Sequence, residues 1–131
     1  MSRFKVIIQY DGTGFRGWQL QKNERTIQGE LEDSLKKIND NNIVRVHGAG
    51  RTDTGVHALG QVAHFDLSTN LDTSELKNAL NGNLPKEIRV MDCDQVSDNF
   101  HARFSAIKRH YLYRTRNNEY LLDRNYTWST E

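Results

Sequence analysis

The stretch RFKVIIQY at residues 3–10 alternates apolar and polar side chains, the period of two that is typical of a half-buried β-strand. Side chains two apart point to the same side of a strand, so its apolar members should line a core together. They are Phe4, Val6, Ile8 and Tyr10. We therefore take this strand as the start of the fold.

Two helices are predicted downstream of this strand. Residues 26–38 carry apolar residues at spacings of four, four and three, which form one helical stripe. Its members are Ile27, Leu31, Leu35 and Ile38. The second helix begins at a capping-box pair, Asp72 and Glu75, and ends near Gly82 and Pro85. Its expected buried stripe is Leu76, Ala79 and Leu80.

Four further strands are predicted over residues 43–47, 59–67, 88–93 and 111–115. The order of elements is then βαββαβ followed by one more strand. This order predicts an α+β fold of the ferredoxin-like, split βαβ type, with two helices on an antiparallel sheet.

Length and composition narrow the class of protein. A chain of 131 residues, 36% hydrophobic and 27% charged, suits one folded domain. We see no apolar run of membrane-spanning length and no signal core at the start, so we expect a cytoplasmic protein without membrane association. The single cysteine, Cys93, excludes an internal disulfide, and the five histidines do not show metal-ligand spacing.

Charge is balanced overall but uneven along the chain. The formal net charge is +1. Residues 61–100 hold seven acids and three bases, whereas residues 101–116 hold five bases and no acid. A basic face can therefore meet a phosphate backbone even though the total is near zero.

The glycine-rich stretch GTGFRG at residues 12–17 allows three interpretations. It has the G-x-G-x-x-G form of a dinucleotide-binding loop. However, no helix begins directly after it, and the predicted order of strands and helices is not that of a dinucleotide-binding fold. It can be a tight loop that needs permissive glycines. It can also face RNA, with Arg16 as a cation and Trp18 as a stacking surface.

The stretch GAGRTDTGVHA at residues 48–58 brings an acid, a guanidinium and a histidine together. Its Asp-Thr-Gly triplet is that of aspartic proteases, which the two flanking helices disfavour. Two interpretations stay open. Asp53 can bond backbone amides in a hairpin turn, or it can be kept ionised by Arg51 and act as a nucleophile or general base.

The same stretch and two others are similar to a known family. YDGTGFRGWQ at residues 10–19, GRTDTGVHA with GQV at 50–62, and FHARFSA with RHYLY at 100–113 appear in family order. On these residues the chain resembles the tRNA pseudouridine synthase A family, whose members isomerise uridines in the anticodon arm of tRNA. The pattern Arg-Thr-Asp-x-Gly-Val-His is the most specific of the three.

The resemblance implies roles for individual residues. Asp53 would be the catalytic aspartate, with Arg51 orienting and pairing with it, and Tyr111 would stack under the target uracil. Whether Asp53 attacks as a nucleophile or removes a ribose proton stays open. The remaining substrate contacts would be Arg16, His57, Arg103, Lys108 and Arg109.

The resemblance also implies an organisation. The family has two ferredoxin-like halves, forms homodimers and needs no cofactor or metal. Residues 1–116 would be the N-terminal catalytic domain, and residues 117–131 the start of the region that leads to the second half. We thus expect either a tRNA pseudouridine synthase, homodimeric at full length, or an inactive RNA-binding half-domain. An RRM-type binder is disfavoured, because no RNP1-like aromatic run appears on a central strand.

Overall fold

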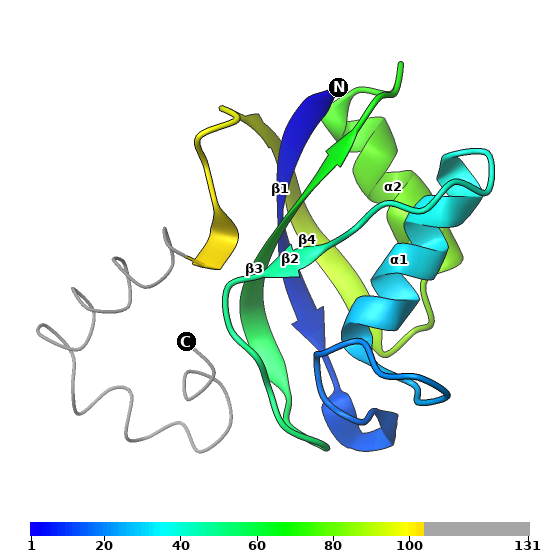
Figure 1. Cartoon of the computed structure of the whole chain (residues 1–131), viewed down its shortest axis with the longest axis vertical. Coiled ribbons are helices and arrows are strands. Elements are labelled where there is room, and N and C mark those ends of the chain that lie inside the picture. Colours follow the sequence, from blue (N-terminus) through cyan, green and yellow to red (C-terminus); the bar gives the residue numbers. More distant parts are fainter. Residues whose placement is uncertain (104–131) are drawn as a thin grey trace, which may run out of the picture.

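The structure, a computed structural model, describes residues 1–103 of the chain. One antiparallel sheet has the strand order β2-β3-β1-β4. Figure 1 shows two helices on one face of this sheet and residues 97–103, which follow the last strand, on the opposite face. The elements are β1 (Ser2–Tyr10), η1 (Gly12–Gly14), α1 (Ile27–Ile38), β2 (His47–Gly48), β3 (Ala58–Leu67), α2 (Thr73–Asn83) and β4 (Ile88–Val96). The predicted α+β class, with two helices on an antiparallel sheet, is confirmed; the expected strand 111–115 lies outside the described residues.

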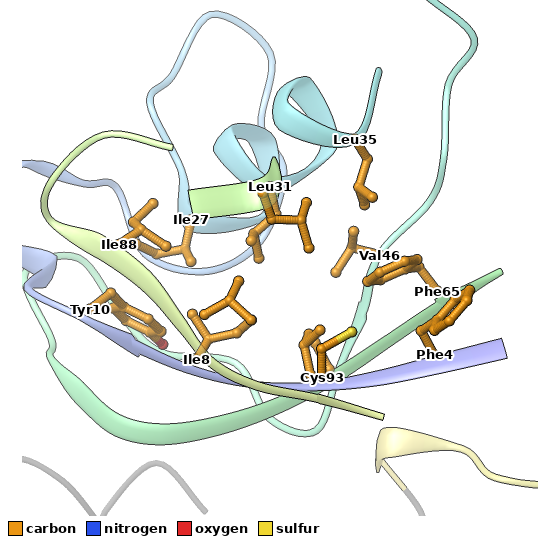
Figure 2. Packing of buried hydrophobic residues seen from close by; sticks show 14 of the residues in the cluster. Phe4, Ile8, Tyr10, Ile27, Leu31, Leu35, Val46, Phe65, Ile88 and Cys93 are labelled. Atoms are coloured by element: carbon orange, nitrogen blue, oxygen red, sulfur yellow. The ribbon is translucent and has the colours of Figure 1, made fainter. Parts of the chain in front are cut away.

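The core lies between the sheet and the two helices, as Figure 2 shows for its labelled side chains. All four apolar residues predicted to line it from β1 are buried. Three of the four stripe residues of α1 are buried as well, and Ile38 packs at the margin. Thr26 accepts a hydrogen bond from the Gly29 amide and caps α1, so the helix begins one residue later than predicted.

The second helix starts as the capping-box pattern predicts. The Glu75 amide donates to Asp72 Oδ1 at 2.8 Å, and the Asp72 amide donates to Glu75 Oε1 at 2.9 Å. Leu76 and Leu80 are buried, whereas Ala79 is only half-buried. Neither helix in residues 1–103 has the length and apolar character needed to cross a membrane.

The predicted strand 43–47 is wrong in extent, because only His47 and Gly48 pair with β3. Val44 and Val46 are nevertheless buried. However, side chains of α1 occupy the main-chain groups of Val46: its amide donates to Glu32 Oε2 at 3.0 Å, and its carbonyl accepts from Gln28 Nε2 at 3.3 Å. An extended segment bonded to a helix cannot offer the same groups to a neighbouring strand.

The last described strand is longer than predicted. Pairing with β1 continues as far as Arg3 opposite Val96, three residues beyond the expected end at Cys93. The alternation that marks a strand in the sequence stops earlier, because the C-terminal part of β4 carries mostly exposed polar residues. The last residues of β4 are therefore in the strand because β1 extends far enough to pair with them, and not because their side chains are buried in alternation.

We predict that Glu32→Ala lowers the free energy of unfolding by about 1–3 kcal/mol, because it leaves the buried amide of Val46 without an acceptor. Urea denaturation would measure the change. The exposed Asp33 on the same helix supplies the control, and Asp33→Ala should stay within about 0.5 kcal/mol of the parent. Equal effects in the two variants would contradict the role of Glu32.

Candidate active site

Asp53 lies at the tip of the segment that connects β2 to β3, and its side chain is exposed. The turn is closed by the main chain: the Val56 amide donates to the Asp53 carbonyl at 3.1 Å, and Gly55 adopts a φ of +81°. Within residues 1–103 the Asp53 carboxylate forms no hydrogen bond or ion pair, so it does not stabilise the turn. A carboxylate that faces solvent in this way is available to a ligand.

The glycine-rich segment 11–18 packs directly against the Asp53 segment. The Trp18 amide donates to the Thr52 carbonyl at 3.0 Å, and the Gly55 amide donates to the Phe15 carbonyl at 3.2 Å. The hydroxyls of Tyr10 and Thr52 share a buried hydrogen bond of 2.9 Å. Main-chain and side-chain bonds thus hold the two loops together.

The structure corrects one interpretation of the glycine-rich segment and excludes another. Trp18 is only 3% exposed, and its indole covers Gly48, where a Cβ would come within 2.6 Å of the ring. Its indole therefore packs mainly inside the fold and leaves little exposed surface on which a base could stack, although it contributes to the lining of a neighbouring cleft. A short 3-10 turn over Gly12–Gly14, with no helix before Ile27, also excludes a dinucleotide-binding loop.

An open cleft of about 690 Å³ lies beside the Asp53 segment. We call it the basic cleft, because Arg51, Arg103, His47 and His101 contribute to its wall. Asp53 follows Arg51 by two residues and is not part of the lining. Arg51 and Asp53 do not form an ion pair with each other in residues 1–103, so their predicted pairing stays a prediction.

Arg3 brings the segment after β4 to this cleft. Its guanidinium donates to both carboxylate oxygens of Asp66, at 2.8 and 3.0 Å, and this holds the pKa of Asp66 below its usual value. It also donates to the carbonyls of Asp98 and Phe100, at 3.0 and 2.6 Å. The chain carrying Arg103 is thereby fixed on the open face of the sheet. Nothing in the sequence indicated this role, since Arg3 reads as an exposed residue at a strand end.

Three histidines from distant segments meet under the basic cleft. The His47 and His64 rings stack with centroids 4.9 Å apart, and the His101 ring meets His64 edge-on at 4.7 Å. His64 is 1% exposed and its Nδ1 accepts from the Ala102 amide at 3.0 Å. Burial, with positive charge on Arg3 nearby, lowers the pKa of His64 to about 4. No group of three or more potential ligands in residues 1–103 is arranged to hold a metal ion.

The other predicted contacts fall in different places. Arg16 is exposed and lies 3.3 Å from Glu24 in an ion pair. His57 faces away from the basic cleft, where its Nδ1 accepts from the Gly12 amide at 2.9 Å. That nitrogen also lies 3.1 Å from Asp11, an ion pair that forms only if the ring is protonated. Tyr111, Lys108 and Arg109 lie outside the described residues.

Comparison with known sequences supplies the family. The sequence profile of tRNA pseudouridine synthases matches residues 6–105. The chain belongs to this family. It is similar to proteins named tRNA pseudouridine synthase A from Afipia carboxidovorans, 52% identical over 118 residues, and from Maricaulis maris, 49% identical over 131 residues. The matches cover 89% and 98% of this chain but 48% and 52% of those proteins, so the chain spans about half the length of these relatives.

In this member of the tRNA pseudouridine synthase family, the buried His64 predicts a loss of stability at mildly acidic pH. The unfolded chain binds a proton at the ordinary pKa of 6.5, whereas the folded chain does so only near 4. As the pH is lowered from 6.5 towards 4, the free energy of unfolding should decrease, by up to about 1.4 kcal/mol per pH unit. Above pH 6.5 the ring is neutral in both states and makes no such contribution.

Urea denaturation across this pH range would measure the slope. The control is His64→Gln, whose amide oxygen can still accept from Ala102 but does not titrate. It should remove the His64 contribution to the slope. If parent and variant show the same pH dependence, His64 is not the group responsible.

Proposed function

We propose that the protein isomerises uridine to pseudouridine in the anticodon arm of tRNA, with Asp53 as the reactive carboxylate. The observation that carries the proposal is the family match over residues 6–105, within which Asp53 is exposed beside a cleft walled by cationic groups. A free carboxylate next to a surface suited to phosphates is what a reaction on a nucleotide requires.

The chemistry defines what Asp53 must do. The bond between uracil N1 and ribose C1′ breaks, the base rotates, and a bond forms between C5 and C1′. The C5 proton is released and N1 ends protonated, so the overall composition is unchanged. Asp53 can attack the sugar as a nucleophile, or it can remove a ribose proton as a base. Its exposed position at the loop tip is compatible with either role.

Binding energy must come from groups around the carboxylate. The target base has to leave its stack, at a cost of a few kcal/mol. We propose that Tyr111 stacks on the extracted uracil and that Arg51 orients Asp53, as the family resemblance implies. Phosphates would be bound by Arg103 on the cleft wall and by Arg16, together with Lys108 and Arg109, while His57 would contact the substrate from the other side of the Asp53 segment.

We further propose that the full-length protein is a cytoplasmic homodimer that works without a cofactor. An isomerisation has no second substrate and no change of oxidation state, so the chemistry does not demand a redox or group-carrying cofactor. Residues 1–116 would form its N-terminal catalytic domain, and residues 117–131 would begin the connection to the second half.

A second candidate is an RNA-binding unit without turnover. It is favoured by the observation that the chain spans about half the length of its relatives, because an active site that needs groups from both halves would be incomplete. Such a unit would still bind tRNA through the cationic groups of the basic cleft.

Asp53→Ala should abolish release of tritium from C5-labelled uridine in tRNA while leaving the tRNA dissociation constant within about twofold, since affinity comes from phosphate contacts. Asp33→Ala, which also removes one exposed carboxylate, should keep full turnover. Turnover that survives Asp53→Ala would rule out Asp53 as the reactive group. Tight binding by a folded parent chain without any release would favour the RNA-binding unit.

Arg103→Ala should weaken tRNA binding and reduce the slope of log K against log salt by about 0.7–0.9, the amount expected for one lost phosphate contact. Lys37→Ala removes one positive charge from the exposed end of α1, away from the basic cleft and from the cavity that His57 lines, and should leave the slope unchanged. Titrations at several salt concentrations would measure both. Equal losses in the two variants would contradict the basic cleft as the RNA surface.

A further inference from the structure

We propose that Tyr10 is a positioning residue for the reaction: its hydroxyl, acting through Thr52, holds the Asp53 segment in place. The inference rests on the proposed role of Asp53 but is drawn from contacts among residues 10–56. It gives the glycine-rich segment a structural task in addition to the phosphate contact proposed for Arg16.

The first support is a buried hydrogen bond between residues 42 positions apart. Tyr10 is the last residue of β1 and is 3% exposed, and Thr52, directly before Asp53, is 7% exposed. Their hydroxyls are 2.9 Å apart. A phenylalanine at this position would lack the hydroxyl and with it the bond to Thr52.

The second support is that the same residue, Thr52, is also held by its main chain. Its carbonyl accepts from the Trp18 amide at 3.0 Å. On the other side of Asp53, the Gly55 amide donates to the Phe15 carbonyl at 3.2 Å. The carboxylate is therefore carried by a short bridge whose two ends are bonded to the glycine-rich segment.

The third support is the close approach of the two backbones. Gly17 has a φ of +84°, and a Cβ there would lie 2.5 Å from the Thr52 carbonyl oxygen and 3.3 Å from the Asp53 carbonyl carbon. A Cβ at Gly12 would collide with the carbonyl of Val56. These two glycines are thus needed for backbone to lie on backbone beneath Asp53.

Together these contacts explain how an exposed carboxylate that forms no hydrogen bond within residues 1–103 can still be positioned. Thr52 points inward to Tyr10 while Asp53 points to solvent. Catalytic groups need placement to within about 0.5 Å, which a solvated loop alone does not provide. The rigid end of a central strand supplies it here through one hydroxyl.

The test is Tyr10→Phe in the 131-residue chain, with amide hydrogen exchange followed by NMR. The probes are the amides of Gly55 and Val56, whose acceptors are the carbonyls of Phe15 and Asp53. Their exchange should become about tenfold faster, whereas the Leu76 amide of α2, bonded to Asp72, should not change. In tritium-release assays kcat should fall and KM for tRNA should stay constant.

Matched variants separate this effect from a general loss of stability. Ser34→Ala also removes a buried hydroxyl, one that donates to the Leu80 carbonyl and joins α1 to α2. It should leave Gly55 and Val56 exchange and kcat at parent values. Thr52→Val should reproduce Tyr10→Phe, and Thr52→Ser, which keeps the hydroxyl, should restore slow exchange.

The two readouts keep this inference distinct from the proposed function. Unchanged exchange at Gly55 and Val56 in Tyr10→Phe would overturn the inference, whether or not the chain is active. Unchanged kcat in an active chain would also overturn it. If the parent chain shows no turnover, the proposed function fails for this chain, while faster exchange in Tyr10→Phe still supports the role of the hydroxyl.

Discussion

The antiparallel pairing of β1 with both β3 and β4 is the interaction on which the rest of the structure depends. As an inner strand, β1 places its two ends where both functional segments must be held. At one end, Arg3 lies opposite Asp66 and Val96 and holds the chain that carries Arg103. At the other end, Tyr10 bonds Thr52 beside Asp53. A shift of the register by one residue would displace both sets of contacts, because successive side chains along a strand point to opposite faces of the sheet.

The charge that a ligand would meet on this molecule depends on where its charged side chains lie and not on the net charge. The net charge of +1 indicates no preference for a polyanion, yet the basic cleft gathers arginines that are 52 positions apart in the chain. Some acidic residues are paired with arginines outside the cleft lining, as Glu24 is with Arg16 and Asp66 is with Arg3. The field that an RNA phosphate would meet is therefore set by which cations remain on the cleft wall.

Much of the fold could be predicted from local patterns. The stripes of β1 and α1 and the capping box of α2 depend on neighbours within a few residues, and all three are confirmed. The strand 43–47 was wrong because the competitor for its main-chain groups, Glu32, sits on a helix and cannot be seen in a local alternation. One of the three interpretations of the glycine-rich stretch placed Trp18 on an RNA-facing surface, and local sequence could not reject it because its partner Gly48 is 30 residues away.

The sequence by itself determined the class of fold, the family resemblance and the choice of Asp53 as the candidate carboxylate, because periodicity, capping and the motif around Asp53 are all short-range features. Only the tertiary structure decided that Arg51 and Arg103 share one cleft, that Trp18 is internal, and that the glycine-rich segment supports the Asp53 segment. These relations depend on strand order and on close backbone contacts between distant segments. Their energy comes from burial and from hydrogen bonds shielded from water, which form only once the sheet has brought the partners together.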